Sequence, residues 1–384
     1  MSQSGHTQAT PTLYSSLYFH FPFCETKCHY CDFYSLGREK TKMGDATLFE
    51  RAMIKEIRLR GHAGDLSAPL DTLFLGGGTP SMTEPSSMER IFAELFRYTK
   101  LNPNYEWTME ANPSSIETEQ FKRYRALGIN RVSMGIQSLK NEHLLNLGRV
   151  HDEGQALAAL DSVFTAGFDN VSTDLLCGVP GQSLADLESH MEKLTSFPIS
   201  HLSIYLLTLT KTHKMYKDLP SEDVQLEHLL FIDQFMKSKG FEHYEISNFA
   251  KPTRRARHNL AYWTEKSYLA FGPSAHSFSA DMNTRFKNIS SLHKYAESLI
   301  EKNTLPVEWT ETLSAADRSL EKWMLAIRLA EGFPIEWLKE GYQIQKAARL
   351  LKEGFLETHP ELPTHYRATA RGFSMSDAIV KELS

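Results

Sequence analysis

Cysteine is scarce in this sequence, with four residues in a chain of 384. This scarcity excludes the small disulfide-stabilised domains, which carry many cysteines in a much shorter chain. Three of the four lie together in the segment CETKCHYCDF at residues 24–33, whereas Cys177 lies far downstream. In a cytoplasmic protein, which we expect here, three clustered thiols are more typical of a metal site than of a disulfide.

Long apolar runs and an excess of positive charge are also missing. No run approaches the ~20 apolar residues that a membrane-spanning helix requires, and the formal net charge is −5 at pH 7. The polar residues 1–16 lack the pattern of a signal peptide, so we expect a disordered tail on a cytoplasmic protein. The acidic balance predicts no nucleic-acid partner. We expect membrane association only through a partner.

Short apolar runs alternate with helical patterns from residue 17 to about residue 210. The expected strands are 17–21, 71–75, 106–110, 131–135, 170–176 and 201–207. Apolar side chains recur every three or four residues between them, as in Leu184, Leu187, Met191 and Leu194. A strand followed by a helix, six times over, predicts parallel strands with right-handed crossovers. The pattern fits both a doubly wound sheet and a partial, open barrel.

The pattern changes after residue 210. Residues 241–278 are rich in aromatic residues, arginine and histidine, and we expect strands and ordered loops there. Residues 291–302 have a helical pattern, and from about residue 314 onwards we expect mostly helices with a short β-ribbon near 364–373. The predicted units are a tail at 1–16, a barrel at 17–215, an extension at 216–300 and a small C-terminal domain at 301–384.

Polar residues follow the predicted strands where each strand ends. Ligands bind at the carboxyl ends of parallel strands, so these residues are candidates for one site. The cysteines follow the first strand, and the turn GGGTP at 76–80 follows the second. The later strand ends carry Glu110 and Asn112, then Gln137 with Arg149 further on, then Asp174, and finally Tyr205 and Thr208. Thiols, bare backbone, two carboxylates, an amide and a guanidinium are the composition of a cofactor site.

Two metal centres fit the three cysteines. A structural zinc ion would need a fourth ligand, such as His29, Cys177 or another histidine. A four-iron cluster held by three thiolates would instead leave one iron open to a small molecule. We favour the cluster because all three cysteines lie in one short loop and no second CxxC pair occurs. The glycine turn and the carboxylates also have purely structural interpretations, as a tight turn and as buried hydrogen-bonded acids.

The cysteine segment and the glycine turn together resemble the radical S-adenosylmethionine superfamily. The pattern CxxxCxYC after a first strand and GGGTP after a second carry this resemblance. It implies a [4Fe-4S] cluster on Cys24, Cys28 and Cys31, with S-adenosyl-L-methionine at the open iron. It also implies an α/β fold, a partial (β/α)6 barrel with a small, mainly helical C-terminal domain.

Further motifs are similar to those of the oxygen-independent coproporphyrinogen III oxidase family. LYFHFPFC, GGGTPS, EANP, GIQS, LGR and DLLCGVPGQ occur in the expected order. By this resemblance the S-adenosylmethionine contacts would be Tyr18, Tyr30, Gly77, Gly78, Thr79, Glu110, Gln137, Arg149 and Asp174. Thr208 and His276 fall near two further contacts of that family.

Three departures distinguish the chain from those oxidases. Phe33 stands where the oxidase pattern has a fourth cysteine, only sixteen residues precede the first strand, and Cys177 replaces an aromatic residue. The first two features resemble instead the HemW-type haem chaperones, a sister group that carries an HNxxYW motif. This chain has HNLAYW at 258–263, and Arg254, Arg255 and Arg257 precede it. The resemblance makes His258 a candidate haem ligand, although a histidine beside aromatic residues is more often packed and hydrogen-bonded.

Three functions therefore compete. The first is a chaperone that binds haem and passes it to an unidentified acceptor protein. The second is a coproporphyrinogen III oxidase that cleaves S-adenosylmethionine and decarboxylates propionate side chains. The third is a zinc-stabilised protein that binds nucleic acid. Phe33 and the short N-terminal segment argue against the second, and the acidic balance argues against the third.

Overall fold

The computed structural model describes residues 13–115 and 117–384 of the chain. Residues 1–12 of the predicted disordered tail lie outside the described residues. Within the rest of that segment Tyr14 is buried, and the first strand begins at Ser16. No helix among the described residues has both the length and the apolar character to cross a membrane.

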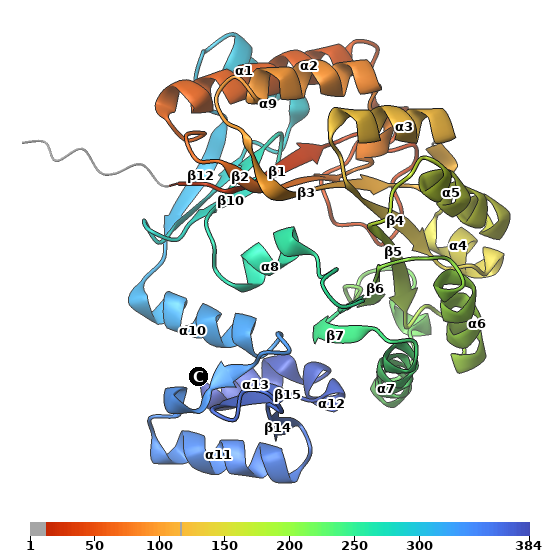
Figure 1. The fold of residues 1–384 in the computed structure, drawn as a ribbon, viewed down its shortest axis with the longest axis vertical. Helices are drawn as coiled ribbons and strands as arrows, with labels where there is room; N and C mark the ends of the chain where they lie inside the picture. Colours follow the sequence, from red (N-terminus) through yellow and green to blue (C-terminus); the bar gives the residue numbers. More distant parts are fainter. Residues whose placement is uncertain (1–12, 116) are drawn as a thin grey trace, which may run out of the picture.

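Six consecutive parallel strands form the centre of the molecule (Figure 1). They are β1 (Ser16–Phe21), β2 (Leu70–Gly77), β3 (Leu101–Ala111), β4 (Arg131–Gln137), β5 (Val171–Cys177) and β6 (His201–Leu206). The helices that connect them are α1 (Asp45–Ala63), α2 (Pro85–Leu95), α3 (Thr118–Leu127), α4 (Asn141–Leu147), α5 (Glu153–Thr165) and α6 (Leu184–Thr195). The alternation of six strands with helices confirms the predicted α/β fold.

Further strands extend this sheet at both edges. β9 (Tyr268–Phe271) pairs parallel with β1, and β10 (His276–Ser279), β11 (Thr284–Asn288) and β12 (Val307–Thr312) follow it in antiparallel order. At the other edge β8 (Asn248–Ala250) and then β7 (Glu242–Glu245) pair antiparallel next to β6. The sheet has twelve strands and reaches Thr312, beyond the predicted domain boundary at residue 301.

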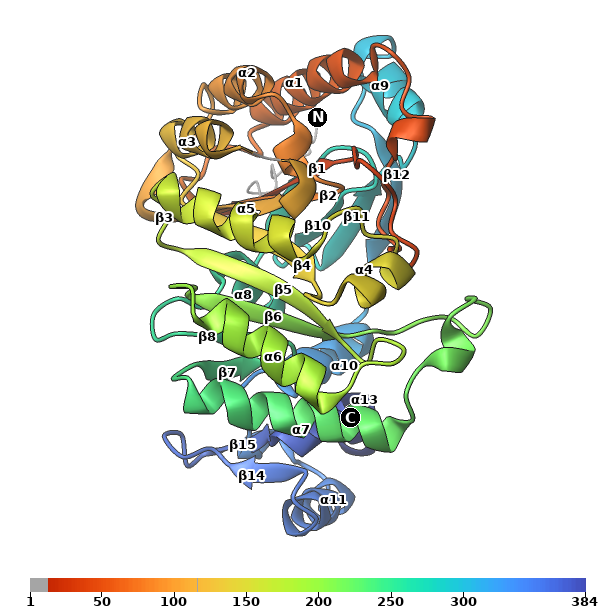
Figure 2. The ribbon, with the colours of Figure 1, turned by 90° about the vertical axis from the view of Figure 1, so that its right-hand side faces the viewer.

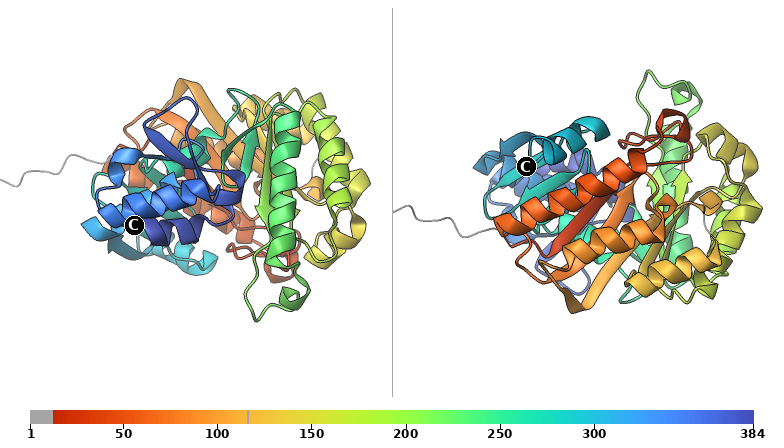
Figure 3. Two further views of the ribbon diagram at one scale, coloured as in Figure 1. Left: turned by 90° about the horizontal axis from the view of Figure 1, so that it is seen from below. Right: turned by 90° about the horizontal axis from the view of Figure 1, so that it is seen from above.

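Aromatic side chains fill the space between the sheet and its outer helices. Phe92 of α2 lies edge-on to Phe19 of β1 at 5.1 Å and to Trp107 of β3 at 4.6 Å between ring centroids. All three are fully buried, and each contributes roughly 1.5–3 kcal/mol by leaving water. Seen from above, α1, α2 and α3 lie across the strands (Figure 3). α7 (Glu222–Ser238) continues this layer next to α6, and α9 (Leu292–Ile300) lies beside α1 (Figure 2).

The short helix α8 (Arg257–Trp263) lies on the other side of the sheet (Figure 1). The carboxylate of Glu106, on β3, accepts the backbone N–H groups of Arg257 at 3.0 Å and His258 at 3.1 Å. This carboxylate stabilises the positive end of the helix. The prediction of strands and loops at 241–278 missed α8, because its start depends on a residue about 150 positions earlier in the chain.

The C-terminal unit has a core of its own around Trp323, Ile327, Phe333 and Ile379. Its elements are α10 (Ala315–Ala326), β13 (Phe333–Pro334), α11 (Gly341–Lys352), β14 (Leu356–Thr358), β15 (His365–Ala368), α12 (Ala370–Phe373) and α13 (Ser376–Leu383). It also contains the 3-10 helix η5 (Ile335–Trp337), and the other 3-10 helices are η1 (Arg38–Lys40), η2 (Pro80–Met82), η3 (Pro113–Ser115) and η4 (Tyr216–Asp218). The unit is mainly helical, as predicted.

The ribbon predicted near 364–373 is only partly correct. β15 pairs with β14 upstream of it and with β13, so the pairing lies largely outside the predicted range. Residues 370–373 form α12 instead, because the Thr369 hydroxyl accepts the backbone N–H of Gly372 at 3.0 Å and caps the helix. Phe373 then packs on the His243 ring at 4.8 Å, which attaches the C-terminal unit to the sheet.

Glu56 of α1 connects the outer helices to the edge of the sheet. Its buried carboxylate accepts the backbone N–H of Gly272 at 2.9 Å, the Asn288 side-chain amide at 2.7 Å and the Tyr295 hydroxyl at 2.6 Å. We expect Glu56→Ala to lower the free energy of unfolding by about 3–5 kcal/mol, because three buried donors lose their acceptor. Urea denaturation measures this change.

Glu89→Ala is the control for that variant. Glu89 pairs with Arg123 at 3.3 Å on the surface, with about half of each side chain exposed. Such a pair contributes about 0–1 kcal/mol. Equal effects of the two substitutions would contradict the role assigned to Glu56.

Candidate cofactor site

A cavity of about 500 Å³ opens at the carboxyl ends of the six parallel strands. Twelve of the fifteen residues predicted for the cofactor and haem sites line it. They are Cys24, Cys28, Tyr30, Cys31, Gly77, Gly78, Thr79, Glu110, Gln137, Arg149, Asp174 and Thr208. Residues from the ends of six strands therefore meet in one place, as the parallel order of the strands requires.

The cysteine loop is held at its neck and at its tip. At the neck, the Cys24 N–H donates to the Leu36 carbonyl at 2.9 Å, and the Leu36 N–H donates to the Pro22 carbonyl at 2.6 Å. At the tip, the His29 N–H donates to the carbonyl of Leu147, at the end of α4, at 3.1 Å. These bonds close the loop on itself and attach it to the barrel, so all three cysteine residues border the cavity.

Side-chain donors reach two of the three sulfur atoms. The Thr79 hydroxyl donates to Cys24 Sγ at 3.6 Å, and Arg149 Nη1 donates to Cys28 Sγ at 3.4 Å. Asn112 joins these two donors, because its Nδ2 donates to Thr79 Oγ1 and its Oδ1 accepts from Arg149 Nη2, both at 2.9 Å. Such donors stabilise the thiolate form that binds metal. Asn112 was noted at a strand end in the sequence, but its bridging position depends on the fold.

Burial opposes ionisation of these thiols. It raises the pKa of Cys24 and of Cys31 above the ordinary thiol value, with the hydrogen bond from Thr79 opposing the rise at Cys24. Both thiols are therefore protonated at neutral pH, and a metal that binds them must displace protons. The three cysteines form no disulfide and are half-buried, so their sulfurs are available to a ligand.

Two residues were named from the sequence as a possible fourth zinc ligand, Cys177 and His29. Neither side chain is free to bind zinc together with the three cysteines. Cys177 is fully buried in the core, because Asp174 and Leu176 of β5 face the cavity and alternation turns Cys177 towards the helices. His29 Nδ1 is hydrogen-bonded to the Asn146 carbonyl at 3.1 Å. Across the described residues, no three His, Cys, Asp or Glu side chains converge as ligands of a single ion. A four-iron cluster would be held by the three thiols of this loop without a fourth protein ligand.

The glycine turn lies against the cysteine loop with no room for side chains. A Cβ at Gly78 would lie 2.6 Å from the Phe23 carbonyl oxygen, and Gly77 has a φ of 106°, which favours glycine. The Gly77 N–H donates to Glu110 Oε2 at 3.2 Å. The turn therefore exposes backbone to the cavity and positions the Glu110 carboxyl group.

Two carboxyl groups share the inner wall of the cavity. Burial, and then the neighbouring charge of Asp174, raise the pKa of Glu110 to about 8. Burial also raises the pKa of Asp174, although Ser133 Oγ donates to its carboxylate at 3.2 Å. A cationic ligand between these groups would favour their ionised forms. Ser133, which lies inside β4, was not identified from the sequence.

Gln137 reaches the cavity through an irregularity in β4. Its φ is 68°, a left-handed conformation that non-glycine residues rarely adopt. The pairing register of β4 with β5 shifts between Gly135 and Gln137. Bulges of this kind redirect side chains next to functional sites.

Tyr18, His258 and His276 lie outside the lining of this cavity. The Tyr18 hydroxyl is 3.1 Å from His20 Nδ1, and its ring stacks on Phe74. His276 is exposed at the start of β10, with its ring 5.9 Å from that of Trp309. Tyr205 lines the cavity although the sequence suggested it only as a strand-end residue.

His258 is fully buried between the sheet and α8. Its Nδ1 is 2.7 Å from the Thr72 hydroxyl, and its Nε2 is 2.7 Å from the Tyr262 hydroxyl. Burial lowers the pKa of His258 to about 3, so the ring is neutral. Both ring nitrogens are engaged inside the fold, and neither is free to bind a haem iron in this conformation.

Comparisons with known proteins agree with this geometry. The family model of the radical SAM superfamily matches residues 18–194. The chain is 32% identical over 375 residues to a heme chaperone HemW of Mycobacterium tuberculosis, covering 96% of this chain and 94% of that protein. A heme chaperone HemW of Bacillus subtilis is 30% identical over 336 residues, covering 85% of this chain and 86% of the relative. The resemblance found in the sequence is therefore confirmed.

The fold has a match among solved structures. Coproporphyrinogen III oxidase (HemN) from Escherichia coli, described as a radical SAM enzyme, superimposes with a TM-score of 0.81. The match has 21% sequence identity and covers 97% of this chain and 90% of the oxidase. It confirms the predicted partial barrel with an additional C-terminal domain.

The pKa of Glu110 predicts a pH dependence of stability. Because the folded-state pKa lies above the ordinary value of 4.5, the folded state binds more protons, and stability falls as pH rises towards about 8. We expect Glu110→Gln to gain stability relative to the parent protein by ~1 kcal/mol between pH 7 and pH 9, a change in Tm of roughly 1–2 °C. Thermal denaturation without added ligand measures it.

Glu119→Gln is the matched control, because the Glu119 side chain is 79% exposed on α3. Its substitution should change Tm little at either pH, because the carboxylate is exposed to water. A Glu110→Gln difference that is equally flat would mean that Glu110 ionises normally.

Proposed function

The chain belongs to the HemW family of the radical SAM superfamily, and we propose that it is a haem chaperone. In this proposal the protein binds haem and transfers it to an acceptor protein, and it carries a [4Fe-4S] cluster and S-adenosylmethionine. The observation that carries the proposal is the similarity to HemW proteins over nearly the whole chain. We place the transfer in the cytoplasm, with any membrane contact made through the acceptor.

We assign the cluster to Cys24, Cys28 and Cys31. They are unpaired thiols on one restrained loop, and donors from Thr79 and Arg149 reach two of their sulfurs. When bound, the cluster would supply an open iron to the amino and carboxylate groups of S-adenosylmethionine. These donors would stabilise the thiolates, and the loop would hold them apart from bulk solvent.

We assign S-adenosylmethionine to the remainder of the same cavity. The bare backbone of Gly77 and Gly78 allows a close approach, and Glu110 and Asp174 would stabilise positive charge. The other proposed contacts on the lining are Tyr30, Thr79, Gln137, Arg149 and Thr208. Tyr18 and His276 would take part only at a second position outside this cavity.

Replacing the cysteines tests the cluster. We expect Cys24→Ala, Cys28→Ala and Cys31→Ala each to lose most of the iron and sulfide that the parent protein takes up on anaerobic reconstitution, since each removes a metal ligand. Iron and acid-labile sulfide assays, with the absorbance spectrum, measure the loss. Cys177→Ala, which changes the buried fourth cysteine, should retain about four irons per chain. Zinc in place of iron in the parent protein would overturn the assignment.

The role of His258 in haem binding depends on a change of conformation. Ligation by its Nε2 would require the ring to leave Tyr262, and access would require α8 to separate from Glu106. Breaking these contacts leaves buried polar groups unpaired, at a cost of about 1–3 kcal/mol for each group. The prediction of direct ligation therefore applies only to a second conformation in which α8 has moved.

A haem titration of the cluster-reconstituted protein tests the proposed function. We expect a shifted Soret band that saturates near one haem per chain. We expect His258→Ala to keep this shift, because the ring is engaged within the fold, and to lose about 2–4 kcal/mol of stability. Anaerobic absorbance titration and thermal denaturation provide the two measurements.

His201→Ala is the matched control for that variant. His201 is also fully buried between two hydroxyl groups, with Nδ1 2.7 Å from Ser172 Oγ and Nε2 2.8 Å from Tyr244 Oη. If folded His258→Ala loses the Soret shift and His201→Ala keeps it, His258 is an iron ligand in an open state. If the parent protein shows no saturable binding, the chaperone proposal fails, and conversion of coproporphyrinogen III becomes the reaction to assay.

A further inference from the structure

Arg131 is a buried cation that lacks a carboxylate in direct contact. It begins β4 and is 2% exposed, on the strand face that carries Ser133 towards the cofactor cavity. Its Nη1 donates to Thr108 Oγ1 at 3.4 Å, its Nε has no partner among the described residues, and it forms no ion pair with any of them. A guanidinium stays charged when it is buried, so this charge must be compensated from a greater distance.

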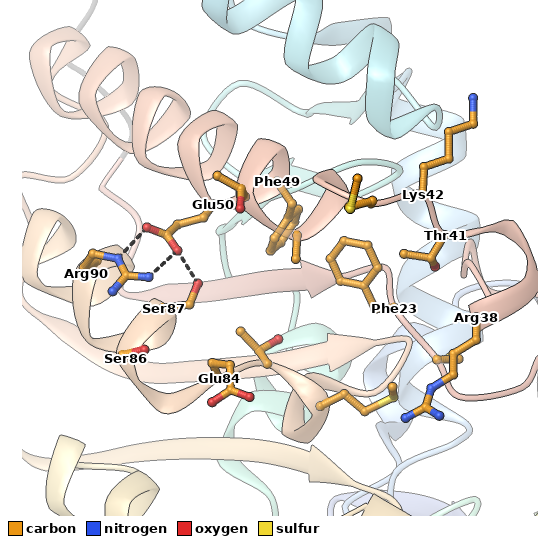
Figure 4. Close-up of a pocket in the computed structure, with 16 residues that line it drawn as sticks. Phe23, Arg38, Thr41, Lys42, Phe49, Glu50, Glu84, Ser86, Ser87 and Arg90 are labelled. Carbon is orange, nitrogen blue, oxygen red and sulfur yellow. Dashed lines mark hydrogen bonds and ion pairs between the residues drawn. The ribbon is translucent and has the colours of Figure 1, made fainter.

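Two other arginines show the usual arrangement. Arg90 lines a second cavity, of about 650 Å³, between the starts of α1 and α2, and it donates to both carboxylate oxygens of Glu50 at 2.6 and 2.7 Å (Figure 4). Arg60 of α1 is 5% exposed, nearly as deeply buried as Arg131, and its Nη1 lies 3.2 Å from Asp65 Oδ2. Arg131 is therefore not one half of a close ion pair, and its position needs another explanation.

The charge of Arg131 acts on the two carboxyl groups of the cofactor cavity. The register places Arg131 opposite Thr108, while Glu110 lies opposite Ser133, two residues further along both strands. The Ser133 hydroxyl donates to the carboxylate of Asp174. Burial raises the pKa of Glu110 and of Asp174, and the positive charge of Arg131 opposes this rise at both groups.

We propose that Arg131 is a positioning residue of the cofactor cavity, whose buried charge favours the ionised forms of Glu110 and Asp174 and so prepares them for a cationic ligand. With the ligand bound, Arg131 lies on one side of the two carboxylates and the positive charge of the ligand on the other, so two cations balance two anions. Arg131 does not touch the ligand, because it lies outside the lining of the cavity. The inference rests on the proposed function, since it takes S-adenosylmethionine as that ligand.

This arrangement couples binding to the release of a proton. Without the ligand one cation faces two carboxyl groups, so the pair retains a proton below the Glu110 pKa of about 8. A cationic ligand must displace this proton, so its affinity rises with pH and becomes constant above about pH 8. Loss of the Arg131 charge raises the pKa of both carboxyl groups, and the proton is then retained to a higher pH.

The other titratable groups around this wall leave one exception to control. The hydroxyl groups of four tyrosines stay neutral because burial raises their pKa, and two histidines stay neutral because burial lowers theirs. The tyrosines are Tyr18 of β1, Tyr205 of β6, Tyr244 of β7 and Tyr262 of α8, and the histidines are His201 of β6 and His258 of α8. Arg149 stays positive, and the carboxylate of Glu106 accepts two N–H groups of α8. The exception is Glu245 of β7, because burial raises its pKa to about 7.

Binding of S-adenosylmethionine as a function of pH tests the role of Arg131. Equilibrium dialysis of the labelled compound against anaerobic, cluster-reconstituted protein gives the Kd from about pH 6 to about pH 9. In the parent protein the Kd should fall as pH rises and become constant near pH 8. Arg131→Gln removes the charge and keeps a donor for Thr108. Its Kd should be about tenfold higher than that of the parent at pH 7 and should still be falling at pH 9, as expected for a pKa that is about one unit higher.

Four further variants separate charge from packing. Arg131→Met is a second neutral replacement and should change the pH profile as Arg131→Gln does, whereas Arg131→Lys keeps the charge and should restore the parent profile. Arg60→Gln removes another buried guanidinium that does not line the cavity, so it should lower Tm and leave the pH profile unchanged. The comparison is repeated in the Glu245→Gln background, where the effect of Arg131→Gln should persist.

The outcomes distinguish this inference from the proposed function. If the parent protein binds S-adenosylmethionine and the folded neutral variants follow the parent pH profile, Arg131 has only a structural role and the inference is overturned, while the cofactor assignment stands. A change in Arg131→Lys as large as that in Arg131→Gln would also overturn it. If the parent protein binds no S-adenosylmethionine at any pH, the cofactor assignment itself fails, and the inference fails with it.

Discussion

The parallel pairing of six strands is the constraint on which the rest of the molecule depends. Parallel strands bring all their carboxyl ends to one edge of the sheet, so residues from Cys24 to Thr208 meet although the chain separates them widely. The register determines the finer positions: Glu110 lies opposite Ser133, and Gly135 lies opposite Asp174. The two carboxyl groups thus share a wall with the hydroxyl groups of Ser133 and Ser203 near Asp174. The pKa values of both carboxyl groups rise because this wall is buried.

Strand ends and motifs could be predicted from the sequence because both are local signals. Apolar runs located the six strands within a few residues, and the strand ends together with the family motifs pointed to twelve residues that line the cavity. The parts that were missed depend on contacts between distant segments. α8 begins where Glu106 caps it, Asn112 joins Thr79 to Arg149, and Ser133 faces the cavity only through the pleat of β4. These contacts join residues that are far apart in the sequence, so no periodic pattern of apolar residues predicts them.

The cysteine loop lies between two cavities. Cys24 borders the cavity at the strand ends and also the cavity between the starts of α1 and α2. The loop is held by bonds to Leu36 and Leu147, so a ligand that changes its conformation on one side must change the wall on the other.

The HNxxYW motif has a structural explanation that needs no ligand. His258 connects Thr72 of β2 to Tyr262 of its own helix, and His201 makes the same kind of connection between Ser172 of β5 and Tyr244. Both rings are neutral because burial lowers their pKa, and both fasten a flanking segment to the parallel sheet. His201 lies outside any such motif, so the arrangement of a histidine between two hydroxyls recurs in this fold as a packing device. Both ring nitrogens of His258 are hydrogen-bonded within the fold. This side chain is therefore better placed to position α8 than to bind an iron atom.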